Sequence, residues 1–310
     1  MPTLLDFRRR IRSVKNTQQI TRAMKFVAAA RLRRAQEAAL AARPFAQELA
    51  RVLRSTMARI DEPQHPLLAH RPEQNVLVIV LAGERGLAGA FNSNILRKAH
   101  EFFRKNKDKK IFVIPVGKKG RDSLKKAGFT FAGEFVNVLS RVDFRTAREI
   151  AGLASELYVK EQIDSVYIVF SEFKSILVPV LTVEKLLPIE SLPADESAEH
   201  RGLHTEDDKL RTRRTEHLAE QTATKVDYIY EQPEQELLAK LLPRYVETQV
   251  LRAMLESSAA EYAARMTAME SATKNAGDVI DALTLHMNKV RQAAITKEII
   301  EIVSGAAYGA

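Results

Sequence analysis

The sequence predicts an α/β domain combined with a long α-helical coiled coil that the two ends of the chain form together. Two observations lead to this prediction. Both ends of the chain consist of good helix formers with almost no Gly or Pro, whereas the middle alternates short β-branched runs with helical segments. Strands that alternate with helices are typical of a layered α/β domain with a largely parallel sheet.

The N-terminal helix is predicted from residues 3–43, which contain neither Gly nor Pro. Pro44 can kink this helix, and the helical pattern then continues to about Ile60, before the breaker sequence DEPQHP. After Pro233 the helical pattern returns and lasts to the end of the chain. We therefore predict three parts: an N-terminal shaft helix over 1–60, a central α/β domain over 61–232 and a C-terminal shaft helix over 233–310.

A seven-residue apolar repeat runs through the C-terminal helix for about five heptads, which indicates a coiled coil. Its two columns are Leu255, Tyr262, Met269, Ala276, Leu283 and Val290, and Ala259, Met266, Thr273, Ile280, Met287 and Ala294. The N-terminal helix offers a stripe of Phe7, Ile11, Val14, Ile20, Met24, Val27 and Ala28. We predict that the two helices pair as an antiparallel coiled-coil shaft, with the α/β domain at one end. The C-terminal helix would be on the order of 110 Å long, and its uncharged end, SGAAYGA, predicts that a partner covers the tip.

The central part is predicted to be a Rossmann-like α/β domain. Its predicted strands are 76–82, 111–116, 129–136, 165–170, 176–184 and 226–231, and its predicted helices are 92–105, 119–127 and 144–161. Residues 188–224 are polar and highly charged without a strand pattern, which predicts a surface excursion from the domain.

Composition excludes several classes of function. The chain of 310 residues contains no Cys, which excludes disulfides, thiolate zinc sites and cysteine nucleophiles. Its longest apolar run, near 76–83, has the length of a strand and not of a membrane span, and its start lacks the apolar core of a signal peptide. We therefore expect a cytosolic protein that can belong to a membrane complex.

The basic charge is concentrated at the N-terminus. Residues 1–59 contain 14 Lys or Arg and 3 Asp or Glu, while the net charge of the whole chain is +9, so the remainder is slightly acidic. A solvated helix face is one explanation. We favour the other, in which this segment faces a polyanion or an acidic protein surface.

The segment AGERGLAGAFNSNI (82–95) lies between a predicted strand and a predicted helix, where phosphate-binding loops occur. Its glycine spacing matches neither G-x-G-x-x-G nor G-x-x-x-x-G-K-[ST], and no acidic residue closes the next strand. We therefore favour a tight strand–helix turn, with turn chemistry from Asn92 and Asn94, over a nucleotide site. The segment VGKKGRD (116–122) could bind phosphate, but it is more typical of a turn with solvated lysines.

No other pattern assembles a catalytic site. His200 and His204 have helical i, i+4 spacing but no third ligand, so no metal site is predicted. No Ser lies in a G-x-S-x-G motif. The sequence thus predicts no catalytic residue, no cofactor and no metal, and a protein that is not an enzyme by itself.

Five segments together resemble one family, the gamma subunits of F-type ATP synthases of the bacterial type. They are IRSVKNTQQITRAMKFVAAARLRRAQ (11–36), RGLAGAFNSNI (85–95), DYIYE (227–231), LLPRYVETQVLRAMLESSAAEYAARMTAMESAT (241–273) and NKVRQAAITKEIIEIVSGA (288–306). The resemblance covers nearly the whole chain apart from the polar excursion, and the first and last motifs are long and specific. One departure is AGERGLAGAF, where the family usually has Ser-Asp-Arg-Gly-Leu-Cys-Gly-Gly-Phe. The absence of Cys also excludes the thiol switch of chloroplast members.

The resemblance implies a rotor. In the family, the terminal helices form a bent shaft inside a ring of three alpha and three beta subunits, and the α/β domain touches the epsilon subunit and the ring of c subunits. Proton flow turns the c-ring and the shaft, which drives each beta subunit through its nucleotide-binding states. The chain would couple proton flow to ATP synthesis and hydrolysis, and regulate both ATPase activity and proton flow. It would lie at the cytoplasmic face of the bacterial inner membrane, in a complex that also includes delta, a and b subunits.

The resemblance also implies contact residues. By motif match, Met24 and Lys25 fall next to the beta lever, and the C-terminal helix would meet the beta subunits at Arg265, Arg291, Gln292 and Thr296. The residues alone leave alternatives open, since Met24 can equally be a coiled-coil core residue and Arg265 a solvated helix charge.

Two other functions compete with the rotor. A basic coiled-coil protein that binds nucleic acid would explain the Arg-rich first helix, but the chain has no recognised DNA- or RNA-binding motif. A nucleotide-dependent enzyme built on the α/β domain would rest only on the mismatched glycine loop at 82–95.

Overall fold

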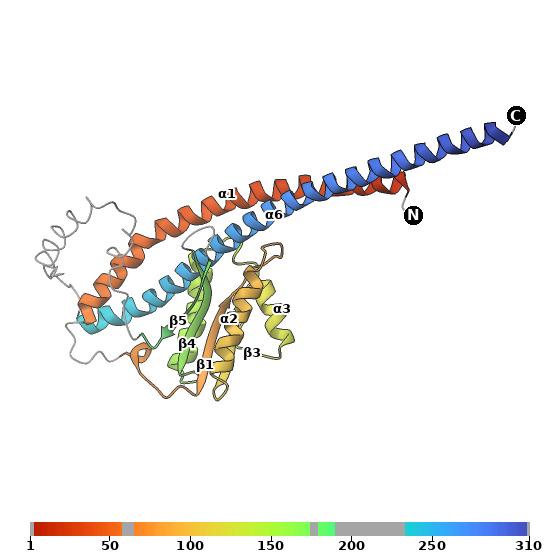
Figure 1. Ribbon diagram of the computed structural model, residues 1–310. Helices are drawn as coiled ribbons and strands as arrows, with labels where there is room; N and C mark the ends of the chain where they lie inside the picture. The colour runs from red at the N-terminus through yellow and green to blue at the C-terminus, as the bar shows by residue number, and fades with distance from the viewer. Residues whose placement is uncertain (1–2, 58–64, 174–178, 190–232, 309–310) are drawn as a thin grey trace, which may run out of the picture.

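The computed structural model describes residues 3–57, 65–173, 179–189 and 233–308. Two long helices, α1 (Leu4–Met57) and α6 (Glu234–Tyr308), lie side by side along most of α1, and an α/β domain is attached to one side of the pair (Figure 1). The predicted antiparallel shaft and the predicted α/β domain are therefore confirmed. Since residues 58–64 and 190–232 lie outside the described residues, the domain boundaries at 60 and 232 stay predictions.

A five-stranded sheet forms the centre of the domain, in the order β3-β2-β1-β4-β5. Its strands are β1 (Asn75–Leu81), β2 (Lys110–Val116), β3 (Thr130–Phe131), β4 (Ser165–Phe173) and β5 (Pro179–Leu187). The first four pair in parallel, and β5 pairs antiparallel with β4 at the edge. The expectation of a largely parallel sheet is confirmed. The strand expected over 129–136 shortens to two residues, while the strand expected over 226–231 and nearly all of the polar excursion lie outside the described residues.

Helices cover both faces of the sheet. The connections between the strands contain α2 (Phe91–Lys105), α3 (Lys118–Lys126) and α4 (Phe144–Val159), and the short helix η1 (Pro66–Leu68) precedes β1. In β1, the side chains of Leu77 and Ile79 belong to one core cluster and those of Val78 and Val80 to another, on the opposite face. Because both faces are buried, this strand reads as an unbroken apolar run instead of an alternating one.

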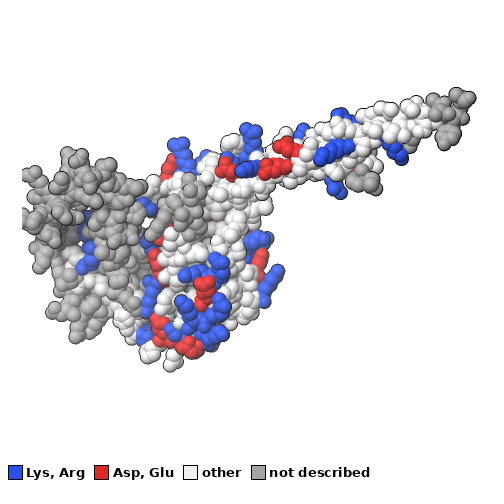
Figure 2. All heavy atoms as spheres, in the orientation of Figure 1, with Lys and Arg blue, Asp and Glu red and all other residues white. Residues whose placement is uncertain are grey.

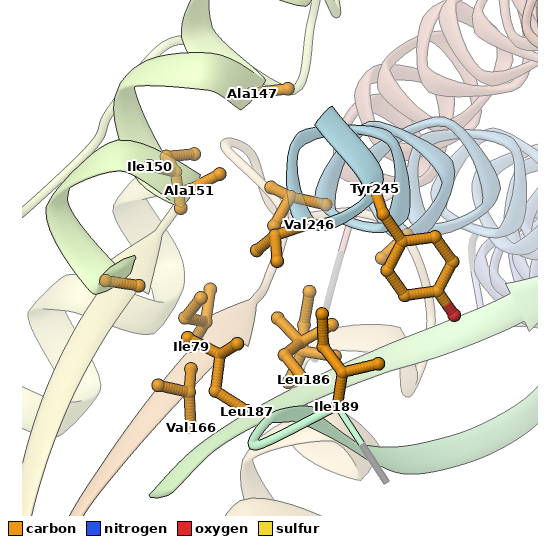
Figure 3. Packing of buried hydrophobic residues seen from close by; sticks show 14 of the residues in the cluster. Ile79, Ala147, Ile150, Ala151, Val166, Leu186, Leu187, Ile189, Tyr245 and Val246 are labelled. Atoms are coloured by element: carbon orange, nitrogen blue, oxygen red, sulfur yellow. The ribbon is translucent and has the colours of Figure 1, made fainter. Parts of the chain in front are cut away.

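The shaft is anchored in the larger core cluster. Figure 3 shows Val246 of α6 beside Ile150 of α4 and the sheet residues Ile79, Val166 and Leu187. Leu53 of α1 belongs to the same cluster and is fully buried. The last turns of α1 and the first turns of α6 are thus part of the domain core, and α1 remains helical through Pro44.

Beyond the domain, the two helices meet along a seam with alternating spacings of three and four residues. The less exposed positions of α1 include Phe7, Ile11, Val14, Gln18, Thr21, Lys25, Ala28 and Leu32. All twelve residues predicted for the two columns of α6 are buried or half-buried. Ile20 and Val27 were wrongly predicted for the stripe of α1, since they are 60% and 53% exposed. The seam keeps its heptad spacing through Gln18, Thr21 and Lys25, which leaves both apolar residues on the outer face.

No helix in the described part of the chain combines the length and the apolarity that crossing a membrane requires.

We predict that Leu53→Ala will lower the free energy of unfolding by about 2–5 kcal/mol, because it removes a fully buried side chain and leaves a cavity where the shaft enters the core. Urea unfolding of the full chain measures this. Leu40→Ala on the same helix is the matched control, since Leu40 is 58% exposed, and it should change stability by less than about 0.5 kcal/mol. Equal effects of the two substitutions would contradict the anchoring of α1 in the core.

Candidate functional site: the shaft and its collar

The six residues predicted to contact partners are spread along the shaft and do not form a single cluster. Met24 and Lys25 are half-buried near the middle of α1, and the Nζ atom of Lys25 lies 2.6 Å from the Oε1 atom of Glu270 on α6. Arg291, Gln292 and Thr296 are exposed on the part of α6 nearest the C-terminus, and the hydroxyl of Thr296 donates to the carbonyl of Gln292. Arg265 lies where the shaft leaves the domain. Nothing in the structure of the single chain tests their contacts with partners.

A polar layer interrupts the apolar seam near the middle of the shaft. The hydroxyls of Thr21 and Thr273 lie 2.8 Å apart, and the Nε2 atom of Gln18 donates to the carbonyl of Thr273. A Cβ atom on Gly277 would lie only 3.2 Å from the same amide nitrogen of Gln18. Polar groups that must match across a coiled coil fix its register at a cost in stability, so this layer opposes sliding of α1 along α6.

A second polar arrangement surrounds α6 where it leaves the domain, and we call it the collar. It consists of residues 257–265 of α6 and the loops 83–90 and 137–140 of the domain. The hydroxyl of Ser258 donates to the carbonyl of Leu139, and that of Tyr262 to the carbonyl of Ser140. These hydrogen bonds join one face of the shaft to fixed points of the domain.

Arg265 and Glu261 form the charged part of the collar. Their side chains are 12% and 6% exposed, and they form an ion pair with the i, i+4 spacing of a helix. The guanidinium of Arg265 also donates to the carbonyl of Gly86, 3.4 Å away, and lies 5.7 Å from the centre of the Tyr262 ring. Burial raises the pKa of Glu261, and Arg265 opposes this shift. The alternative of a solvated charge at Arg265 is therefore wrong.

The domain side of the collar is held by an internal carboxylate. Glu84 is 8% exposed, and its carboxylate accepts hydrogen bonds from the backbone N–H groups of Lys118, Val138 and Leu139. Lys118 is the first residue of α3, the position where a helix offers its amides to an anion. The Glu84 carboxylate already occupies this position. A phosphate group could therefore bind the segment VGKKGRD there only by displacing Glu84. The expected turn is reduced to Gly117, since Lys118 and Lys119 already belong to α3, but both lysines are exposed as expected.

The glycine loop is a tight turn, as expected. The backbone N–H of Gly83 donates to Asn92, and the side-chain amide of Asn92 reaches back to the carbonyl of Arg85. A Cβ atom on Gly83 would lie 2.9 Å from the Oδ1 atom of Asn92 and 3.0 Å from the carboxyl group of Glu261. The glycine lets the loop approach the shaft closely.

Sequence reasoning did not identify Glu84 or Glu261 as collar residues. Glu84 lies in the glycine loop beside Arg85, and Glu261 lies in an Ala-rich stretch of α6. A charged residue within the apolar repeat is a signal that could have indicated Glu261, whereas nothing in the sequence around Glu84 indicates a buried carboxylate. No group of three or more acidic or His residues among the described residues could hold a metal, and His200 and His204 lie outside the described part.

Comparison with known proteins agrees with this architecture. A family model described as ATP synthase matches residues 3–307. The ATP synthase gamma chain of Solibacter usitatus is 47% identical, with 99% of both chains covered. That of Pelotomaculum thermopropionicum is 45% identical with the same coverage. The chain belongs to the ATP synthase gamma chain family.

Solved structures share the fold. A chain in the central stalk and c-ring of the Tetrahymena thermophila mitochondrial ATP synthase is 25% identical, with a TM-score of 0.56. The match covers 82% of this chain and 99% of that one. A chain of the Euglena gracilis mitochondrial enzyme, in a structure of OSCP, F1 and c-ring, is 20% identical with a TM-score of 0.63, and 98% of this chain and 93% of that chain are covered. At this identity the second match shows a common fold.

We predict that Gly83→Ala will destabilise the chain by about 1–3 kcal/mol, because the added methyl group must push Asn92 or Glu261 out of the collar. Thermal or urea unfolding measures this. Gly86→Ala is the matched control in the same loop, since the nearest atom to its Cβ is the flexible Cε of Lys119 at 4.0 Å. If Gly86→Ala proves as damaging as Gly83→Ala, the close approach of loop and shaft is not what stabilises the collar.

Proposed function

We propose that this chain is the central-stalk rotor subunit of a proton-translocating ATP synthase. It turns inside a ring of three alpha and three beta subunits and couples proton flow to ATP synthesis and hydrolysis at their catalytic sites. Membership of the gamma chain family supports this proposal. So does the glycine loop, in which the backbone N–H of Gly83 and the side chain of Asn92 form hydrogen bonds within the turn itself. We infer that the chain is a non-catalytic subunit that regulates ATPase activity and proton flow.

One observation supports a rotor above all others: the bare apolar end of α6. Phe7, near the start of α1, packs against His286 at 5.1 Å between ring centres, so α6 continues past the end of its partner (Figure 1). On this projecting end Ile295, Ile299 and Ile302 are 48%, 56% and 71% exposed. Figure 2 shows it as mostly uncharged surface, whereas charges of both signs gather along the middle of the shaft.

Such an end requires a partner with an apolar inner surface. A helix that exposes branched apolar side chains in water loses roughly 25 cal/mol of stabilisation per Å² left uncovered. A sleeve formed by the ring would cover this surface. Small and uncharged residues also suit a turning contact, because a buried charge would bind one orientation and remain unpaired in others.

The contact residues divide by position. Arg291, Gln292 and Thr296 lie on the projecting end and would face the beta subunits directly. Met24 and Lys25 lie in the polar middle of the shaft, where the basic face of α1 would meet acidic levers. Attraction between exposed charges is modest, about 0–1 kcal/mol per pair, which suits contacts that break and form again at each third of a turn. Arg265 would act from within the collar, through the position of Gly86 and its loop.

The α/β domain would face the other partners. The epsilon subunit and the c-ring of Fo would contact it, in a complex that also includes delta, a and b, at the cytoplasmic face of the bacterial inner membrane. The similar chain of the Tetrahymena thermophila enzyme belongs to a structure of the central stalk together with the c-ring. Torque from the c-ring would then reach α6 through the domain core and the collar. The comparisons give no support to the alternative of nucleic-acid binding.

The test is the ATPase activity of alpha and beta subunits from the same source organism, co-expressed with and without this chain. The chain alone should be inert, join the ring as a single copy and raise its turnover. A chain that ends at Glu301 should cause a milder loss, since it removes the tip and keeps the contact residues. The double variant Ile299→Ser and Ile302→Ser is the control, because it removes apolar side chains from the projecting end of α6 and keeps the full length of the chain. If no complex forms and turnover is unchanged, the rotor proposal fails.

A further inference from the structure

A buried carboxylate on α6 lies between the shaft and the sheet, outside the collar. Glu256 is 8% exposed, and its Oε2 atom is buried without a hydrogen-bond partner among the described residues. A buried carboxylate oxygen without a donor is costly when ionised and much less so when protonated. The position therefore favours a neutral carboxylic acid.

One helical turn earlier, Arg252 connects the shaft to the edge of the sheet. Its guanidinium forms an ion pair with Glu184 of β5, and its Nε atom is buried without a partner among the described residues. Residues four apart lie on the same face of a helix, so Arg252 can reach Glu256 as well as Glu184. The same guanidinium thus lies within reach of one carboxylate of the domain and one of the shaft.

The charges around Glu256 come from each element packed against it. Arg252 on α6 and Arg43 on α1 favour its ionised form, while Glu172 on β4 and Glu184 on β5 oppose it. Burial is the largest influence and, with the two glutamates, raises the pKa of Glu256 from 4.5 to about 7. Burial raises the pKa of Tyr245, which also lies close enough to Arg252 and Glu184 to interact with both charges.

We propose that Glu256 is a proton switch that decides which carboxylate Arg252 holds, Glu184 of the domain or Glu256 of the shaft. With the proton bound, Glu256 is neutral and Arg252 stays with Glu184, which fastens α6 to β5. When Glu256 gives its proton to water, it becomes a buried anion one turn from Arg252. The guanidinium then turns toward it and β5 loses its ion pair with the shaft. This concerns the chain itself and does not rest on rotation within a ring.

The sign of the pH dependence follows from the two states of the carboxyl group. The folded chain keeps the proton up to about pH 7, whereas the unfolded chain releases it near pH 4.5. The contribution of Glu256 to the free energy of unfolding therefore falls as pH rises between these two values, and it is constant at higher pH. Below pH 4.5 both states hold the proton, and Glu256 contributes no pH dependence.

The experiment compares the full-length chain with Glu256→Gln, which imitates the protonated form. Between about pH 5.5 and 8.5, the unfolding constant of the wild type should rise on the order of 30-fold more than that of the variant. Glu236→Gln is the matched control, an exposed glutamate on the same helix, and it should keep the wild-type slope. Equal slopes for wild type and Glu256→Gln would overturn the proposal.

Hydrogen exchange in β5, measured relative to exchange in β1, tests the transfer of Arg252, because a fall in global stability alone would speed exchange in both strands. After correction for intrinsic rates, the amides of β5 should exchange faster at high pH in the wild type and stay slow in Glu256→Gln. In Glu184→Gln they should be fast at every pH. Exchange in β5 that does not respond to pH would overturn the switch. Should Glu256→Gln fail to fold, infrared spectroscopy near pH 6 replaces it, with Glu261→Gln as the background because burial raises the pKa of Glu261 as well. A protonated carboxyl band that remains in Glu261→Gln would support the proposal, and the absence of any such band would refute it.

Discussion

The main constraint on this structure is the small surface that two paired helices can bury against each other. A two-stranded coiled coil covers only a narrow seam of each helix, and helices of this length need more than that to stay fixed relative to a domain. The chain solves this by building one end of the pair into the sheet. Leu53 of α1 and Val246 of α6 belong to the same core as the strands, so the shaft and the domain share a hydrophobic core.

Burial then decreases along α6 away from this anchor. Residues 253–263 are buried without interruption, the seam positions Met269 and Ala276 alternate with exposed ones, and most residues after Val290 are exposed. Local stability follows buried contact. The shaft is therefore held most firmly at the collar. Polar contacts in its middle fix the register of the two helices, and its end depends on a partner. This order matches a part that is driven at one end and acts at the other.

Much of this was predictable because it rests on periodicity. The heptads of α6 and the unbroken apolar run of β1 reflect helix and strand geometry directly, so the shaft and the parallel sheet followed from the sequence. The predicted stripe of α1 was partly wrong. It included Ile20 and Val27 because they are apolar, whereas the heptad spacing places Gln18 and Thr21 in the seam. Short edge strands such as β3 depend on pairing with a neighbour, which a local pattern does not contain.

The buried charges were the least predictable part, and they have the clearest mechanical meaning. Apolar contacts have no direction and fix the angle of a helix about its axis only through the shape and burial of its side chains. Hydrogen bonds do have direction. Tyr262 and Arg265 each join α6 to a particular carbonyl of the domain, and Glu84 holds the domain loops in place. Turning α6 within the domain would break these bonds and leave buried charges unpaired, which is costly. The collar thus adds directional contacts to the shared hydrophobic core, and these couple rotation of the domain to rotation of the shaft.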